Sequence, residues 1–284
     1  WNYNDVAILY RTNAQSRALE EKLMMHNIPY RIYGGQNFYQ RKEIKDILAY
    51  LKTIDNGQDG QAVRRIINVP KRGIGNTTID RIQEYADFND ITFWEALVNA
   101  KDIDSIKSAA LSKLEPFVDL IGRLRAKEEF MSLRELTEAV IEDTGYIESL
   151  SQTETIEEVE ARRENLDEFI NKVVSYEEGC REAGEEPTLS GLLEEVALIA
   201  DIDNLDESEP HVMLMTLHSA KGLEFPIVYM TGMEDGLFPS YMTIVSDDST
   251  EVEEERRLCY VGITRAEKLL NLTSAKTRMV RGET

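Results

Sequence analysis

The placement of strand-like segments at the two ends of the chain most constrains the fold. Near the N-terminus, Asp5–Tyr10 and Tyr30–Tyr33 are typical of strands, and Ala14–His26 between them is typical of a helix, which is the β-α-β pattern of a parallel sheet. Near the C-terminus, the apolar runs Val212–Met215 and Ile227–Met230 have the length and composition of buried strands. The sequence therefore predicts one α/β domain that is assembled from both ends of the chain.

The region between these strands has helical patterns from Lys42 onward. Ser132-x-x-Glu135 and Thr155-x-x-Glu158 match the capping box, in which each side chain satisfies a free backbone N–H of the other residue. One long helix is predicted over Thr155–Ala183, and shorter helices over Ala62–Asn68 and Thr77–Tyr85. A last strand is predicted over Leu269–Thr273.

This order of elements predicts an α/β fold, in which a large all-helical subdomain is inserted into a parallel-sheet domain. The first junction is expected near Gly34–Tyr39. The second junction falls in the acidic, proline-containing stretch Asp201–Pro210, which has the composition of a linker.

The net charge of −21 over 284 residues argues, as an average, against nucleic acid. The charge is unevenly distributed, however. Residues 1–80 hold 12 basic and 8 acidic residues, a net of +4, whereas the remainder holds 20 and 45, a net of −25. A locally basic surface is compatible with this distribution, and the acidic helical region is most simply a solvated surface.

Other bulk features point to a cytoplasmic fragment. No apolar run approaches the roughly 18 residues of a spanning helix, so no membrane association is expected. The two cysteines, Cys180 and Cys259, do not form a disulfide framework, which suits a reducing cytoplasm. The chain begins with Trp1 rather than Met, close to its first strand, and we expect it to be a piece of a longer protein.

The polar segment Thr216–Glu224 separates two predicted strands and is a candidate binding loop. It is a poor nucleophilic triad, because no Asp is placed to orient His218 and Ser219 is adjacent to it in sequence. It is also a poor metal site, because the three histidines are scattered, and no metal ligands are predicted in this chain. A structural role for His218 remains an alternative.

Three further segments have a functional and a structural interpretation. Arg265 follows a predicted helix and is either a surface residue or an arginine finger for a nucleotide held by another domain. Arg11 and Asn13 follow the first strand, where they can hold a phosphodiester backbone. Thr12 or Asn13 can also cap the helix predicted over Ala14–His26, and the two roles are compatible. Lys71–Gly75 places Gly-Ile-Gly and basic residues between two helices, which favours duplex-backbone binding or a simple helix turn.

Four segments, taken in order, resemble superfamily-one DNA helicases of the UvrD/PcrA/Rep type, and PcrA-type members in particular. They are LYRTNAQSR, VPKRGIG, TLHSAKGLEFP and EEERRLCYVGITRAE. The resemblance covers nearly the whole chain. It implies that the sheet domain is part of the second RecA-like helicase domain, of the kind found in P-loop NTPases. This partial domain is expected to comprise residues 1–38 and 206–284, and the inserted helical subdomain residues 39–205.

The resemblance also implies roles for single residues. Arg265 is expected to be the catalytic γ-phosphate arginine finger, and Glu224 to contact the ribose. Arg11, Asn13 and the set Thr216, His218 and Lys221 are expected to bind single-stranded DNA and to couple it to the nucleotide. Duplex DNA is expected at the Gly-Ile-Gly element, which comprises Lys71, Arg72, Gly73, Ile74 and Gly75.

Some parts of the helicase pattern are absent from this sequence. It contains no Gly-x-x-x-x-Gly-Lys-Ser/Thr phosphate loop, no acidic metal-holding box and no Gln-Asn-Tyr-Arg segment. ATP with Mg²⁺ is therefore expected to bind against a missing N-terminal RecA-like domain that holds the Mg²⁺ ligands. Three positions depart from family DNA contacts, namely Asn37, Ser240 and Arg281.

The expected function is that of the C-terminal half of an ATP-dependent 3′–5′ DNA helicase in repair or replication, in a bacterial cytoplasm near the nucleoid. The fragment alone is expected to lack ATPase activity. Repair, replication or transcription proteins are further expected partners. The alternative is an autonomous module that binds duplex DNA or a protein, and a helicase-nuclease subunit is a weaker reading.

Overall fold

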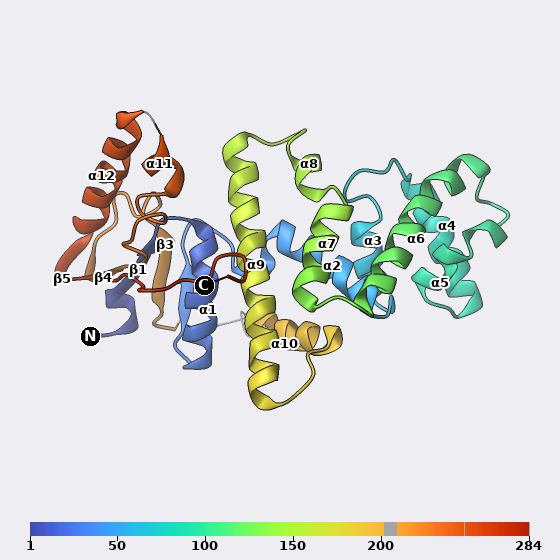
Figure 1. Ribbon diagram of the computed structural model, residues 1–284, viewed down its shortest axis with the longest axis horizontal. Coiled ribbons are helices and arrows are strands. Elements are labelled where there is room, and N and C mark those ends of the chain that lie inside the picture. The colour runs from blue at the N-terminus through green and yellow to red at the C-terminus, as the bar shows by residue number, and fades with distance from the viewer. Residues whose placement is uncertain (202–208, 247, 284) are drawn as a thin grey trace. The chain divides into compact units, whose positions relative to one another are not determined.

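The structure is a computed structural model that describes residues 1–201, 209–246 and 248–283 (Figure 1). The chain divides into two compact units. The first consists of Trp1–Arg41 and Leu198–Thr284, and the second of Lys42–Ala197. The predicted domain boundary at Asp206 lies outside the described residues. No helix in the described parts of the chain is both long enough and apolar enough to cross a membrane.

The first unit is built on a five-stranded, fully parallel sheet with the strand order β2-β3-β1-β4-β5. Its strands are β1 (Val6–Tyr10), β2 (Tyr30–Ile32), β3 (Val212–Thr216), β4 (Phe225–Met230) and β5 (Ala266–Leu272). The central strand β1 places Ile8 beside Leu214 of β3 and beside Tyr229 of β4. The predicted α/β fold class with a parallel sheet is therefore confirmed.

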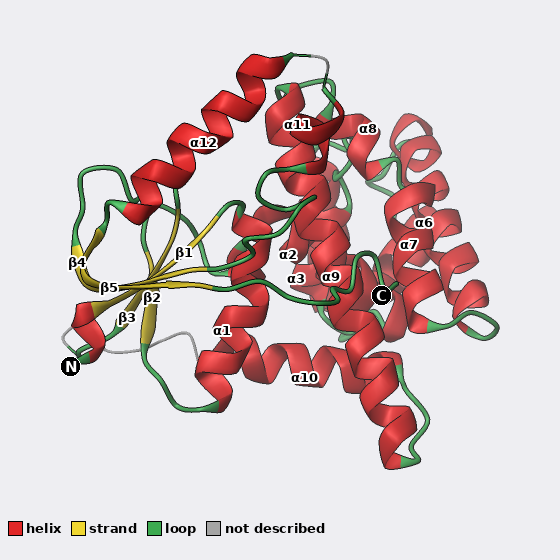
Figure 2. Ribbon diagram, turned by 60° about the vertical axis from the view of Figure 1, so that its left-hand side comes forward, coloured by secondary structure: helices red, strands yellow, loops and turns green. Residues whose placement is uncertain are grey.

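Helices lie against both faces of this sheet, as parallel strands require. On one face, Leu19 and Leu23 of α1 (Ser16–Met25) pack against a cluster that contains Tyr10. On the other face, α12 (Ser249–Ile263) adds Leu258 to a cluster that contains Leu9 (Figure 2). Short helical turns η1 (Tyr3–Asp5), η2 (Asn13–Gln15), η3 (Phe38–Gln40) and helix α11 (Tyr241–Val245) complete the unit.

The second unit is helical in its described residues. Its elements are α2 (Lys42–Asp55), α3 (Gly60–Ile66), α4 (Asn76–Asn89), α5 (Phe93–Val98), η4 (Ala100–Asp102), α6 (Ser108–Glu128), α7 (Leu133–Asp143), α8 (Tyr146–Leu150), α9 (Ile156–Ala183) and α10 (Leu189–Asp201), the last of which extends past Ala197. Helix α2 is central, because it packs on α3, α6, α7 and α9. The predicted long helix is α9, and both predicted capping boxes, at Ser132 and at Thr155, are confirmed.

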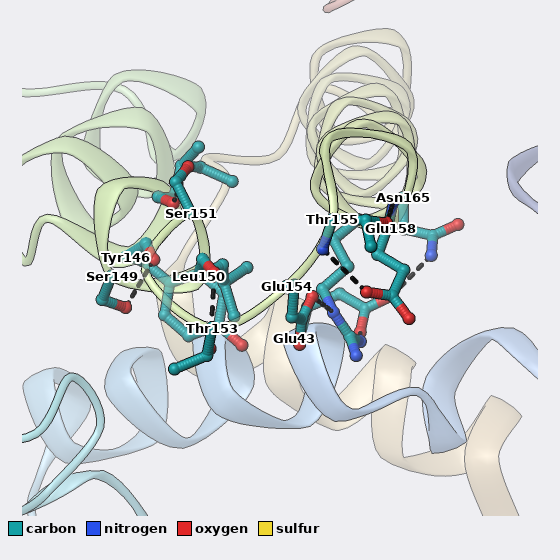
Figure 3. A network of polar contacts seen from close by, with 12 residues as sticks. Glu43, Tyr146, Ser149, Leu150, Ser151, Thr153, Glu154, Thr155, Glu158 and Asn165 are labelled. Atoms are coloured by element: carbon teal, nitrogen blue, oxygen red, sulfur yellow. Dashed lines mark hydrogen bonds and ion pairs between the residues drawn. The ribbon is translucent and has the colours of Figure 1, made fainter.

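Two buried carboxylates on the first turns of α2 fasten neighbouring helices to it. Glu43 accepts from Arg162 Nη1 at 2.6 Å and from Asn165 Nδ2 at 2.5 Å, both on α9 (Figure 3). Asp46 accepts from Arg65 of α3 at 2.7 Å and from the hydroxyl of Tyr146 of α8 at 2.7 Å. A buried carboxylate is tolerated only when it is paired in this way. The neighbouring carboxylate of Asp46 and burial both raise the pKa of Tyr146, with burial the larger cause.

Helix α12 lies unusually close to the sheet at Gly262. A Cβ on Gly262 would lie 2.5 Å from Leu217 Cδ2 and 2.7 Å from Met230 Cε. Such distances are shorter than ordinary Cβ contacts, so a larger residue requires the buried side-chain ends of Leu217 and Met230 to shift. Gly179 is also helical, in α9, but a Cβ there would meet no described atom within 4 Å.

The two glycines give a matched prediction for stability. We expect Gly262→Ala to lower the free energy of unfolding of the sheet unit by about 1–3 kcal/mol through overpacking. We expect Gly179→Ala to raise that of the helical unit by roughly 0.5–1 kcal/mol, because alanine favours the helix. Urea denaturation followed by circular dichroism measures both. A stabilising Gly262→Ala would contradict the close approach of α12.

Candidate functional site

The loops that follow β1, β2 and β3 meet at the carboxyl edge of the sheet. Tyr10 ends β1 beside Thr216, which ends β3, and the backbone N–H of Leu217 donates to the carbonyl of Tyr10 at 2.9 Å. The loop after β2 reaches the same place, because a Cβ on Gly34 would lie 3.0 Å from Ser219 Oγ. Residues far apart in sequence are thereby neighbours at this edge.

Five of the predicted site residues lie at or next to these loops. We call them the carboxyl-edge cluster, and they are Arg11, Asn13, Thr216, His218 and Lys221. In the loop after β3, Thr216 Oγ1 accepts from the backbone N–H of Ser219 at 3.2 Å, and Lys221 N–H donates to His218 carbonyl at 3.4 Å. The loop is therefore a compact turn that presents His218 and Lys221 at the surface.

Arg11 forms an ion pair that local sequence patterns do not indicate. Its Nε donates to both carboxylate oxygens of Glu255, at 2.9 and 3.2 Å, and its Nη2 donates to Oε1 at 2.7 Å. Glu255 lies on α12, and only 9% of its side chain is exposed, against 25% for Arg11. The guanidinium is therefore held in one orientation at the carboxyl edge.

Asn13 is the first residue of a helical segment that Thr12 caps, as the sequence allowed. It begins the short turn η2, and helix α1 begins three residues later, with Gln15 as the capping position. Gln15 Oε1 accepts from the backbone N–H groups of Arg11 and Thr12, at 2.8 and 2.9 Å. Thr12 is the N-cap of η2, which runs directly into α1, so the predicted helix cap at Thr12 is confirmed. Asn13 is exposed.

His218 has a lowered pKa. Although His218 is exposed to solvent, the protein atoms around it partly desolvate the imidazole, and this is the largest cause. The adjacent Arg11 guanidinium adds to it, whereas the carboxylates of Glu255 and Glu254 act in the opposite direction. Because the folded pKa lies below the ordinary value of 6.5, the unfolded chain binds this proton more readily. The contribution of His218 to stability is therefore present above 6.5 and is lost as the pH falls below it.

The two predicted nucleotide-binding residues, Glu224 and Arg265, lie at the amino edge of the sheet. We call them the amino-edge pair. Glu224 directly precedes β4, and Arg265 directly precedes β5. The backbone N–H of Phe225 donates to the carbonyl of Arg265 at 2.9 Å, which joins the two segments. Glu224 is exposed, and Arg265 is partly exposed.

The guanidinium of Arg265 donates to oxygen atoms around the end of α12. Nε donates to Val261 carbonyl at 3.0 Å, Nη1 to Leu223 carbonyl at 2.9 Å and Nη2 to Thr264 Oγ1 at 2.9 Å. The bond to Val261 satisfies a carbonyl that the end of α12 otherwise leaves free. To reach a phosphate, Nη1 and Nη2 would exchange these neutral acceptors for a charged one, which forms the stronger bond.

Two structural elements connect the carboxyl-edge cluster to the amino-edge pair. The segment Thr216–Glu224 starts at the carboxyl end of β3 and finishes at the amino end of β4. Helix α12 carries Glu255, the partner of Arg11, and runs into Arg265. Because each strand residue advances about 3.3 Å, a five-residue strand separates the two edges by roughly 17 Å.

The loop Lys71–Gly75 lies in the helical unit between α3 and α4. Lys71, Gly73 and Gly75 are exposed, and Ile74 is buried. Asn68 fastens the loop, because its side chain donates to Ile74 carbonyl at 2.6 Å and accepts from Ile74 N–H at 3.0 Å. Lys113 Nζ also donates to Gly73 carbonyl at 2.9 Å. The turn is therefore preformed.

Arg72, which is predicted to contact duplex DNA, makes several contacts within the helical unit. Its Nη1 donates to the carbonyls of Ile66 and Ile67 at 2.8 and 3.2 Å, and its Nη2 donates to Tyr50 hydroxyl at 2.7 Å. The guanidinium carbon also lies 4.9 Å from the centre of the Phe117 ring. These partners show that Arg72 supports the loop from within, and its part in duplex binding stays a prediction, because the side chain is partly exposed. Lys71 is exposed.

The three positions that depart from the helicase pattern have local roles here. Asn37 precedes the turn η3. Ser240 caps α11, because its hydroxyl accepts from Thr243 N–H at 3.2 Å. Arg281 adopts a left-handed backbone conformation with φ of 50°.

Within the described ranges, no group of three or more His, Cys, Asp or Glu side chains is arranged to hold a metal ion.

The chain matches the family model described as the UvrD-like helicase C-terminal domain over residues 1–277. The chain belongs to this family.

Curated relatives agree with that assignment. This UvrD-like helicase C-terminal domain is 48% identical over 280 residues to "ATP-dependent DNA helicase PcrA" of Staphylococcus epidermidis strain RP62A and to the protein of the same name from Staphylococcus aureus strain Mu50. The match covers 99% of this chain and 38% of each relative. The chain thus spans well under half the length of these curated relatives.

Sequence reasoning missed Glu255 and Asn68. Glu255 belongs to a run of three glutamates in which nothing local distinguishes it from Glu253 and Glu254, and only the packing of α12 buries it. Asn68 precedes the Gly-Ile-Gly segment by a few residues, and a polar residue near a predicted turn is a weak signal that could have suggested it.

The charged neighbours of His218 should each shift the pKa of its imidazole. We expect Arg11→Ala to raise the pKa of His218, because a repelling cation is lost, and Glu255→Gln to lower it, because an attracting carboxylate is lost. Two-dimensional NMR titration measures both, with His26 and His211 as internal controls. An unchanged His218 pKa in both variants would contradict the arrangement.

Because Arg72 bonds to groups within the helical unit, its removal should lower the free energy of unfolding of that unit. We expect Arg72→Ala to lower the free energy of unfolding of the helical unit by about 2–4 kcal/mol, because charge-assisted bonds to carbonyls and a hydroxyl are lost. The adjacent Lys71→Ala is the matched control, and we expect a change within about 0.5 kcal/mol. Urea denaturation distinguishes them, and equal small effects would show that Arg72 is a surface residue.

Proposed function

We propose that this chain is the C-terminal part of an ATP-dependent 3′–5′ DNA helicase, which moves along single-stranded DNA and unwinds duplex DNA during repair or replication. Membership in the UvrD-like family supports a helicase role. The direction of movement rests on the resemblance of the motifs to superfamily-one helicases. One observation carries the proposal, namely that the carboxyl-edge cluster and the amino-edge pair are connected through α12 and Thr216–Glu224.

The amino-edge pair is proposed to contact ATP. Arg265 would stabilise the negative charge that develops on the γ-phosphate, and Glu224 would accept from a ribose hydroxyl. The donors of Arg265 and the exposed carboxylate of Glu224 suit these two contacts, but they make no cradle for three phosphates. The remaining phosphate contacts and the Mg²⁺ ligands are proposed to come from an N-terminal RecA-like domain, which ATP would join to this one.

The carboxyl-edge cluster is proposed to hold single-stranded DNA. Arg11, Asn13 and Lys221 present hydrogen-bond donors at one edge of a fixed sheet, where they suit phosphate oxygens. Thr216 and His218 belong to the compact turn beside them. Because this turn belongs to the segment that ends at Glu224, a change at the nucleotide edge would shift the DNA contacts.

The loop Lys71–Gly75 is proposed to bind duplex DNA. The exposed glycines bring backbone N–H groups at the start of α4 within reach of phosphates, and Lys71 adds a positive charge. Asn68 and Arg72 fix the turn from within. Such binding would not depend on sequence, because all the contacts fall on the DNA backbone.

If Arg265 is an arginine finger, its removal should slow ATP hydrolysis by the full-length protein. We expect Arg265→Ala to lower the DNA-stimulated kcat by about 10³-fold, as the loss of an arginine finger does. Arg257→Ala is the matched control, because Arg257 lies on the same helix with 74% of its side chain exposed. A steady-state assay with and without single-stranded DNA measures both.

Two results would contradict the proposal. Full turnover by Arg265→Ala would remove the arginine finger. Robust ATP hydrolysis by residues 1–284 alone would show that this chain, whose sequence has no phosphate loop, holds a complete active site.

If residues 1–284 alone bind forked DNA tightly and Lys71→Ala abolishes that binding, the alternative of an autonomous duplex-binding module is favoured.

A further inference from the structure

We propose that Glu255 is a positioning residue for single-stranded DNA binding. Its buried carboxylate holds one edge of the Arg11 guanidinium, so that the other edge is aimed at a DNA phosphate. The inference rests on the proposed function, because it takes the carboxyl-edge cluster as the single-strand site. It adds a residue that makes no contact with DNA and carries the same sign of charge as DNA.

The geometry of the ion pair leaves part of the guanidinium available. Glu255 engages the side edge of Arg11, through Nε and Nη2. The end edge consists of Nη1 and the second N–H of Nη2, and the structure gives it no partner among the residues that it describes. A guanidinium can bind a carboxylate along one edge and a phosphate along the other, because its five N–H groups point outward in one plane.

The surroundings of Glu255 explain why the pair is firmly held. Glu255 lines a cavity of about 260 Å³ whose other residues are apolar or weakly polar apart from Arg256, and they include Phe238 and Cys259. A carboxylate beside apolar side chains is costly unless a cation neutralises it, so the pair stays formed. Arg11 is thereby fixed before DNA arrives, and less side-chain entropy is lost on binding.

The position of Glu255 also connects the two edges of the sheet. Glu255 and Arg265 are ten residues apart, and the helix that carries Glu255 runs into Arg265. A displacement of α12 that accompanies contact between Arg265 and a phosphate would therefore move the residue that orients Arg11. Glu255 thus couples the proposed DNA contact to the proposed nucleotide contact by a rigid helix.

The sign of the effect separates positioning from simple electrostatics. A carboxylate near DNA repels phosphates, so its removal should tighten binding if charge alone matters. If Glu255 positions Arg11, its removal weakens binding, although a negative charge has been lost. The neighbouring Glu254 is the matched control, because it is 71% exposed, lies on the same helix and pairs with Arg257 rather than Arg11.

The experiment measures the affinity of the full-length protein for a fluorescent single-stranded oligonucleotide by anisotropy at several salt concentrations. We expect Glu255→Ala to weaken binding about 5–10-fold, corresponding to about 1–1.4 kcal/mol. We expect Glu255→Gln to weaken it less, because the amide oxygen still accepts from Arg11. Glu254→Gln should bind as tightly as the wild type or slightly more tightly. Equal or tighter binding by both Glu255 variants would overturn the inference.

A double-mutant cycle with Arg11→Ala separates positioning from a general effect on folding. We expect Arg11→Ala to weaken binding and to reduce the salt slope by about 1, because one phosphate contact is lost. In the Arg11→Ala background, Glu255→Ala should cause no further weakening. Equal weakening in both backgrounds would show a merely structural role and overturn the inference. If Glu255→Ala does not fold, Glu255→Gln replaces it in the cycle.

The cycle also separates failure of the inference from failure of the proposed function. If Arg11→Ala leaves single-strand affinity and its salt slope unchanged, the carboxyl-edge cluster is not the single-strand site. If Arg11→Ala weakens binding while Glu255→Ala and Glu255→Gln do not, the site stands and the positioning role of Glu255 falls.

Discussion

Strand β1 can pair with β3 only if the intervening chain leaves the sheet and returns to it. Residues Tyr10 and Thr216 are neighbours in the parallel register, and nearly all the sequence between them lies outside the sheet. The entropic cost of closing a loop rises slowly with its length, so a long insertion is tolerated when it forms its own core. The helical unit does so around α2, whose buried Glu43 and Asp46 bind α3, α8 and α9.

The same pairing fixes where chemistry can occur in the sheet unit. Because all five strands are parallel, every loop that follows a strand emerges at one edge, and every loop that precedes a strand lies at the other. Arg11 and Thr216 therefore share the carboxyl edge, and Glu224 and Arg265 share the amino edge. On the proposed function, one edge holds single-stranded DNA and the other holds ATP, and α12 with the segment Thr216–Glu224 makes them depend on each other.

Much of the fold could be predicted from the sequence, because strands and capped helices leave local signals. The capping boxes at Ser132 and Thr155 are confirmed, whereas β4 and β5 begin two and three residues earlier than predicted. The site was harder to predict, because its decisive contacts are long-range pairings of side chains. Nothing near Arg11 indicates Glu255, and nothing in Lys71–Gly75 shows that Arg72 turns inward onto Tyr50. Such pairings depend on which helix face packs against the core, and local periodicity does not reveal them.

The central claim is that the nucleotide edge and the DNA edge are coupled through one rigid sheet unit. The most direct test is the ratio of single-stranded DNA affinities of the full-length protein with and without a saturating, non-hydrolysable ATP analogue. Binding linkage requires that any such coupling be reciprocal. We expect a ratio of about five or more in the wild type and close to one in Arg265→Ala, although both ligands still bind. An unchanged ratio in Arg265→Ala would contradict it.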